Sequence, residues 1–201
     1  WIYQFPIKRS MISKNFKKLF LLVKTFISMK QLPAQFEEFK GDKAKLAEAI
    51  GITEKDIDDD LPIMYGSTGI WTLLIPIKKL DIFSKMKPEN KRFPEVLTQK
   101  PRASVHPFCL ETYDKDADMH GRHFSSPFSG TVEDPVTGTA SGVMGAYYIS
   151  FIKSLDEKNI AVEQGQEIGK SGMVYVKVKK EYGNLNVEIK GEAVYAGEIF
   201  L

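Results

Sequence analysis

The chain of 201 residues has one cysteine and three histidines. The single thiol, Cys109, excludes an intramolecular disulfide and a cysteine-based zinc site, so nothing argues for an oxidising compartment. We expect it to be buried and inert, because we find no base assigned to it. No apolar run approaches the roughly 20 residues of a membrane-spanning helix. We therefore expect a cytoplasmic protein without a membrane partner.

Acidic residues are missing from positions 1–31, which hold seven of the 28 basic residues. The rest of the chain holds the other 21 basic residues and all 26 acidic residues, so its net charge is −5. A basic, partly apolar head is one signature of a targeting or membrane-surface segment, which would bind vesicles until residues 1–25 were removed. We favour an unassigned piece of a larger domain, because the apolar run is short. No basic and aromatic stripe continues downstream, so we expect no nucleic-acid partner.

Residues 130–152, GTVEDPVTGTASGVMGAYYISFI, join a polar glycine-rich loop to an apolar stripe. The stripe has helical spacing and consists of Val143, Met144, Tyr147, Tyr148, Phe151 and Ile152. It predicts a buried central helix over about 140–153. Two interpretations of its start stay open. Either Thr139 is the N-cap of a core helix, or the free N–H groups and the positive dipole end bind an anion.

The other patterns predict short helices and many strands. Asp42 begins a helix over 43–50, and Thr53 with Asp56 begins a further helical turn. Residues 70–77 are apolar on both faces and predict a buried strand, with Pro76 suggesting an edge or a strand exit. Further strands are expected at 105–113, 160–162, 194–196 and 199–201, and a hairpin at 173–178 and 185–190. We expect the strands after the central helix to curl around it.

Clusters of possible metal ligands do not form a complete set. Residues 58–60 are three aspartates, which we interpret as a solvated loop. Residues 114–118 alternate aspartates as an EF-hand loop does, but Met119 stands at the position of the required glycine. His120 and His123 lack a third ligand. We therefore expect no metal.

Four separate pieces of the sequence together resemble the PhzF family of phenazine-biosynthesis-like isomerases, which are related in fold to diaminopimelate epimerase. The main piece runs Arg122-x-Phe124, Pro127, and Gly130-x-x-Glu133-Asp134-Pro135-Val136-Thr137-Gly138-Thr139-Ala140. The others are Met29-x-Gln31 followed by Pro33, Ser67-Thr68-Gly69 before an apolar strand, and Gln164-Gly165-x-Glu167-x-Gly169-Lys170, where the family more often has arginine at position 170. The resemblance covers about residues 26–201.

The resemblance implies an α+β, diaminopimelate-epimerase-like fold, in which each of two domains wraps a curved sheet around one helix. The active site lies in the cleft between the domains. We assign residues 1–52 to a partial first domain and 53–196 to a complete second domain. A C-terminal strand, 197–201, is expected to return to the first domain. We also expect a homodimer.

By resemblance, the activity is a cofactor-independent proton transfer on a small amino-acid-like carboxylate. Asp134 is the implied catalytic residue. The segment 137–140 is expected to hold the carboxylate through Thr137, Gly138, Thr139 and Ala140, with Thr139 where serine is usual. The family's general-base glutamate, in an N-S-E-T-like stretch, and its partner histidine, in a G-H-x-T-like loop, do not occur here. We therefore expect a truncated isomerase; the alternative is a non-catalytic remnant that binds a small carboxylate or only dimerises.

Overall fold

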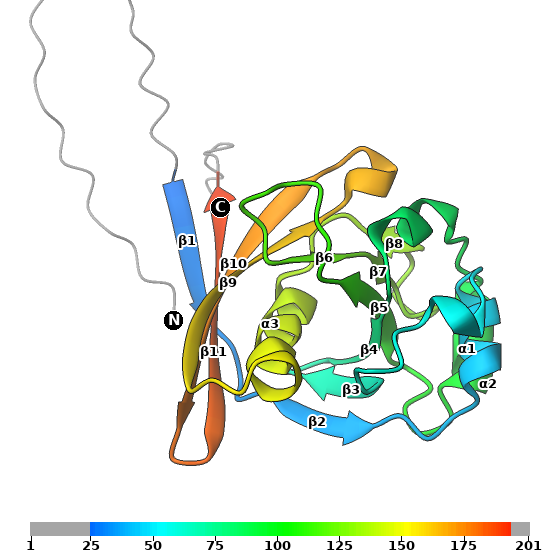
Figure 1. Ribbon diagram of the computed structural model, residues 1–201, viewed down its shortest axis with the longest axis horizontal. Coiled ribbons are helices and arrows are strands. Elements are labelled where there is room, and N and C mark those ends of the chain that lie inside the picture. Colours follow the sequence, from blue (N-terminus) through cyan, green and yellow to red (C-terminus); the bar gives the residue numbers. More distant parts are fainter. Residues whose placement is uncertain (1–24, 194–201) are drawn as a thin grey trace, which may run out of the picture.

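The computed structural model describes residues 25–193, whose strands form one curled sheet around the helix α3 (Gly138–Tyr147) (Figure 1). The order along the sheet is β1-β11-β10-β9-β6-β5-β4-β3-β2, and β7 pairs with β5 and β8. Neighbours are antiparallel except β4 with β5 and β6 with β9. The strands are β1 (Thr25–Lys30), β2 (Gln35–Glu38), β3 (Met64–Ser67), β4 (Trp71–Pro76), β5 (Ser104–Cys109), β6 (Met119–Gly121), β7 (His123–Phe124), β8 (Glu133–Asp134), β9 (Glu157–Gln164), β10 (Gly172–Glu181) and β11 (Asn184–Ala193).

Helices cover both faces of the sheet at β3–β5. On the inner face lies α3, which continues into a π-helical turn (Tyr148–Ile152). On the outer face lie α1 (Lys43–Ala49) and α2 (Phe93–Val96). Four 3-10 turns complete the helical segments of residues 25–193: Glu54–Asp56, Leu80–Lys85, Asn90–Arg92 and Gln166–Ile168.

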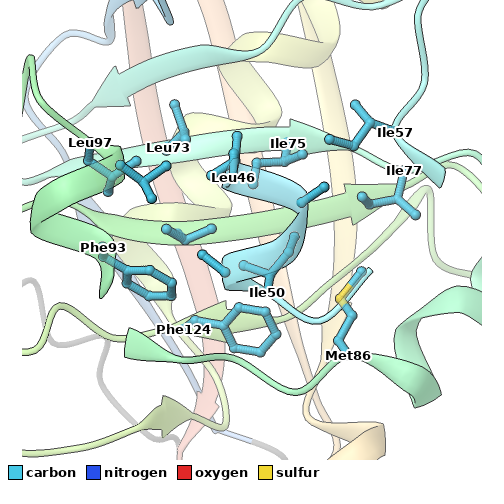
Figure 2. Packing of buried hydrophobic residues seen from close by; sticks show 14 of the residues in the cluster. Leu46, Ile50, Ile57, Leu73, Ile75, Ile77, Met86, Phe93, Leu97 and Phe124 are labelled. Atoms are coloured by element: carbon cyan, nitrogen blue, oxygen red, sulfur yellow. The ribbon is translucent and has the colours of Figure 1, made fainter. Parts of the chain in front are cut away.

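Two hydrophobic cores result, one on each face. Leu74 of β4 packs in the α3 core, whereas Leu73 and Ile75 pack in the core of α1, where Figure 2 shows them with Leu46 and Ile50. Alternate side chains of a strand point to opposite faces, and both faces here are covered. This confirms the buried strand predicted from its apolar run.

Glycines let α3 lie directly against β10 and β11. A Cβ atom at Gly145 would be 2.6 Å from Val176 Cγ1 and 3.1 Å from Val178 Cγ2. At Gly142 a Cβ atom would be 3.1 Å from Val187 Cγ1. Because every residue from Ala140 to Tyr147 is buried, the helix cannot move outward to make room.

We expect Gly145→Val to lower the free energy of unfolding by about 1–3 kcal/mol, because the added side chain overpacks the interface with Val176. Adding Val176→Ala should restore part of the loss. Gly191→Val is the control, since a Cβ atom there meets nothing within 4 Å, and should change stability by less than about 0.5 kcal/mol. Urea unfolding of the four chains measures this; equal losses at positions 145 and 191 would contradict it.

Most predicted elements are present, with three corrections. The helix predicted to begin at Asp42 is confirmed, because the Asp42 side chain accepts a hydrogen bond from the Lys45 N–H at the start of α1. The predicted hairpin is also confirmed, because β10 pairs with β11. Of the two interpretations of Pro76, the sheet edge is wrong, because β4 lies between β3 and β5, and the strand exit is confirmed, because β4 ends at Pro76. The strand expected at 160–162 is the longer β9, and the strand expected over 105–113 ends at Cys109.

Residues 25–52 belong to the same sheet as the rest of the described chain. β1 pairs with β11, β2 pairs with β3, and α1 packs in the outer core. The division into domains at residue 52 stays a prediction. Apart from Thr25, the basic segment 1–25 lies outside the described residues, as do the strands expected at 194–196 and 199–201 and the returning segment 197–201. Within residues 25–193, no helix has the length and apolar character to cross a membrane.

Candidate active site

The signature loop ends at the start of α3, two residues earlier than the sequence suggested. Thr137 has extended backbone angles and is the N-cap, so the interpretation of Thr139 as the cap is wrong. Thr137 Oγ1 is not used as a cap, because it donates to Asp134 Oδ2 at 2.6 Å. Gly138, Thr139 and Ala140 are the first three helical residues, whose N–H groups have no partner within the helix.

Gln164 holds this loop in place. Its Nε2 donates to the Asp134 carbonyl at 2.6 Å and to Thr137 Oγ1 at 3.2 Å, and its Oε1 accepts from the Thr137 N–H at 3.3 Å. The next residue, Gly165, has φ 93°, and a Cβ atom there would be 2.7 Å from the Pro135 carbonyl oxygen. Gln164 and Gly165, from the piece Gln164-Gly165-x-Glu167-x-Gly169-Lys170, therefore support the loop of the main signature. The sequence did not reveal this role.

Arg122 and Glu133 fix the other side of the loop. Arg122 donates from Nε and Nη2 to the two carboxylate oxygens of Glu133 at 2.8 and 2.7 Å. Its Nη1 donates to the carbonyls of Phe83 and Met86. Both charged side chains are about nine-tenths buried. These two signature residues therefore bind each other and hold β8, which ends at Asp134.

A pocket of about 290 Å³ lies at the start of α3. Asp134, Thr137, Thr139 and Ala140, which are four of the five predicted site residues, line it. Gly138, the fifth, instead faces Ile189, whose Cδ1 would be 2.6 Å from a Cβ atom at that position. Within the described chain, Asp134 Oδ1 accepts no hydrogen bond, so half of this carboxylate is available to a ligand.

Further lining residues were not predicted as part of this site from the sequence. Arg102 brings a guanidinium group, which lies over the Phe128 ring at 5.0 Å. Ser104 of β5 and His123 of β7 reach the same pocket. The pocket thus combines one carboxylate and one guanidinium group with several hydroxyls. That combination suits a small ligand that carries both charges.

Two histidines meet below this pocket. The Nδ1 atoms of His106 and His123 are 3.0 Å apart, and His106 Nε2 is 2.8 Å from Met144 Sδ. Burial lowers the pKa of His123 to about 4, although the nearby Asp134 opposes this shift. Burial and the charge of His123 hold the pKa of His106 well below its usual value. Both rings are therefore neutral near pH 7.

We expect the fold to lose stability as the pH falls from 6.5 to 4. In that window an unfolded chain protonates both histidines, whereas buried His123 stays neutral until about pH 4. His123 accounts for about 3 kcal/mol of the stability lost over this window, at roughly 1.4 kcal/mol for each pH unit. His123→Asn should lose about 3 kcal/mol less than the parent chain between pH 7 and pH 4, in urea unfolding at both values. Identical pH dependence of the two chains would show that His123 titrates normally.

His120 belongs to a different cluster. Its Nδ1 is 3.0 Å from Glu163 Oε1 and its Nε2 is 3.0 Å from Glu167 Oε1. Glu163 also accepts from the N–H groups of Tyr113 and Asp114. His120 and His123 therefore do not converge. Cys109 is buried, as predicted, and burial raises the pKa of its thiol to about 12, so its inertness stays a prediction that this environment favours.

The curled sheet around one helix, with a polar pocket at the helix start, defines an α+β protein of the diaminopimelate-epimerase-like class. A family model described as "Phenazine biosynthesis-like protein" (PhzC-PhzF) matches residues 22–198. The chain belongs to this family, and both the predicted fold class and the resemblance are confirmed.

Curated relatives extend the comparison. The chain is 54% identical over 170 residues to an uncharacterized isomerase, YfhB, of Bacillus subtilis; the match covers 85% of this chain and 58% of that one. It is 23% identical over 158 residues to the trans-2,3-dihydro-3-hydroxyanthranilate isomerase of Pseudomonas fluorescens, covering 78% and 52%. The chain thus spans little more than half the length of these relatives.

Solved structures are similar as well. The crystal structure of a PhzF-family phenazine biosynthesis protein of Bacillus anthracis matches with a TM-score of 0.84 at 53% identity, covering 87% of this chain and 60% of that one. The structure of a predicted epimerase of Pseudomonas aeruginosa matches with a TM-score of 0.63 at 23% identity, covering 83% of this chain and 55% of that one. The second match supports the fold alone.

Proposed function

We propose that this chain carries the substrate pocket of a PhzF-like isomerase that moves a proton on a small amino-acid-like carboxylate, without a cofactor. The observation that carries the proposal is the meeting of Asp134 with the start of α3 in one pocket. The relatives named isomerases support the reaction class.

The charges of the pocket favour a zwitterionic substrate. Asp134 is suited to an ammonium or hydroxyl group, because its Oδ1 is free of protein partners among the described residues. Arg102 is suited to a carboxylate because its guanidinium group is positively charged. The N–H groups at the start of α3 are suited to it as well, because they lie at the positive end of the helix dipole. Thr137 and Thr139 add hydroxyls between the two ends. A bound amino acid would thus have its α-carbon near Asp134.

Isomerisation breaks a C–H bond, passes the proton to a base, and returns a proton to another position. Asp134 is the one carboxylate among the described residues that line the pocket. We propose that it holds the substrate's polar group and assists this transfer, while the main base comes from a part of the protein that this chain does not contain. The exposed side chains of Ile70, which also lines the pocket, and Leu32 are apolar surface that such a part would cover.

The test compares two chains in D₂O by proton NMR. One is the chain itself; the other is extended at its N-terminus by the part of Bacillus subtilis YfhB that the match leaves out. The substrates are a panel of L-amino acids and the dihydro-hydroxyanthranilate named for the Pseudomonas fluorescens relative. We expect deuterium to replace a carbon-bound proton only with the extended chain. Exchange by the chain alone would show that it contains its own base.

The alternative is a non-catalytic protein that binds a small carboxylate or only forms dimers. It is motivated by the family's general-base glutamate motif and partner histidine motif, neither of which occurs in this sequence. If the extended chain also fails to exchange while either chain binds an amino acid by calorimetry, this alternative holds. We also propose a homodimer, which sedimentation equilibrium of this chain tests directly.

A further inference from the structure

His123 is placed between the pocket and the interior. Its ring lines the pocket beside Asp134, its partner in the β7–β8 pairing, and it is only 9% exposed. Its Nδ1 points to His106 Nδ1 at 3.0 Å. Its Nε2 has no hydrogen-bond partner within residues 25–193 and is not among the buried polar atoms that lack one. This nitrogen is therefore the one that a ligand can reach.

The surroundings of His106 decide which tautomer the pair adopts. Met144 Sδ lies 2.8 Å from His106 Nε2, and a thioether can accept a hydrogen bond but cannot donate one. His106 therefore carries its proton on Nε2 and has a lone pair on Nδ1. His123 must then donate from its own Nδ1 to complete the 3.0 Å contact. A neutral imidazole has one N–H, so His123 Nε2 has a lone pair.

The opposite tautomer of His106 would place the lone pair of its Nε2 against a lone pair of Met144 Sδ. If His106 donated from Nδ1 to His123, its Nε2 would face the sulfur of Met144 without a hydrogen. That nitrogen is fully buried and would stay without a partner, which is unfavourable because it loses its hydrogen bond to water without gaining another. Gly121 also keeps this end of the ring enclosed, since a Cβ atom there would be 2.7 Å from His106 Nε2. No other polar group in the described contacts of this nitrogen would satisfy it.

We propose that His123 binds the substrate through Nε2, accepting a hydrogen bond from an N–H or O–H group, and that His106 and Met144 are positioning residues that set its tautomer. The tautomer does not depend on the proposed isomerase function, whereas the identity of the donor rests on it. With Asp134 as the second acceptor, the pocket selects a ligand with at least two N–H or O–H hydrogens at one end. A primary ammonium group fits this requirement, and a quaternary ammonium group does not.

The tautomer can be measured in the free protein by imidazole ¹⁵N chemical shifts at pH 7, which separate protonated from unprotonated ring nitrogens. We expect His123 to be protonated on Nδ1 and His106 on Nε2. His120, in its separate cluster with Glu163, serves as an internal reference. A proton on His123 Nε2 would overturn the proposal, and this result is independent of any enzymatic activity.

Met144→Leu tests the cause, because leucine has similar volume and no acceptor. We expect a mixture of both tautomers in this variant, with the His120 shifts unchanged. An unchanged His106–His123 tautomer would show that Met144 does not set it, and that part of the proposal would fail.

Binding is tested with glycine and its N,N,N-trimethyl derivative, which have the same charges but differ in N–H groups. We expect glycine to shift the His123 Nε2 signal at least several-fold more than the trimethyl compound at equal concentration. His123→Asn keeps a donor near the Nδ1 position and removes Nε2, so it should weaken glycine binding. His123→Gln keeps a polar group near the position of Nε2 and should bind glycine more strongly than His123→Asn does. Equal shifts from the two ligands, or no shift, would overturn the binding role even with the expected tautomer.

Discussion

Asp134→Asn in the extended chain should lower the rate of deuterium exchange by about 10²–10⁴-fold, the usual contribution of a positioned acid or base. The asparagine keeps an oxygen for the Thr137 hydroxyl, which donates to Asp134 Oδ2 at 2.6 Å. The loop and the cap of α3 should therefore stay in place. What is lost is the negative charge that faces the pocket through Oδ1.

Unfolding measurements separate this effect from a loss of structure. We expect the free energy of unfolding of Asp134→Asn to lie within about 1 kcal/mol of the parent chain. Asp81→Asn is the matched control, because Asp81 is exposed and, within residues 25–193, its carboxylate forms an ion pair with Lys85 alone, four residues away. It should exchange at the parent rate. If Asp134→Asn exchanged as fast as this control, Asp134 would have no part in proton transfer.

Arg122→Met should lower the free energy of unfolding by about 3–5 kcal/mol, because it leaves the carboxylate of Glu133 buried without its partner. The side chain exposures are 7% for Arg122 and 11% for Glu133. The substitution also removes the two hydrogen bonds to the carbonyls of Phe83 and Met86. Since Glu133 precedes Asp134 in β8, the pocket should loosen as well, and glycine should bind more weakly.

The double variant Arg122→Met/Glu133→Gln isolates the charge. We expect it to be more stable than Arg122→Met alone, since no uncompensated carboxylate remains. Lys85→Met removes one partner of an exposed pair, at 66% exposure on both sides, and should change stability by less than about 1 kcal/mol. Urea unfolding of the four chains gives the comparison. Equal losses for Arg122→Met and Lys85→Met would show that the signature arginine is dispensable for folding.

Local patterns predicted the elements well wherever one stretch of chain decides its own conformation. The stripe from Val143 to Ile152 predicted a buried helix, and the described α3 with its π-helical turn ends at Ile152. The cap was misjudged at Thr139 because both threonines satisfy the local rule. A tertiary contact decided between them, since Gln164 holds Thr137 in its extended conformation.

The pocket was predicted in part. Asp134 and the start of α3 are consecutive in the chain, so their proximity follows from the motif. Arg102 comes from another segment, and nothing in the local sequence around it marks a site. His123 stands inside the signature, between Arg122 and Phe124, but the motif did not assign it a role at this site. Their approach to Asp134 requires the pairing of β5 with β7 and of β7 with β8. Strand pairing over such separations depends on the whole curled sheet, which no single window of sequence contains.

Sequence alone determined the family signature, the order of its four pieces, and the presence of a helix at the end of the EDPVTG loop, because each depends on neighbouring residues. Tertiary structure decided what those residues do. It turned Glu133 inward to Arg122, left Asp134 facing the pocket, and brought His106 and Met144 together behind His123. The physical reason is burial: a side chain's partners, charge and tautomer depend on which distant groups share its enclosed space.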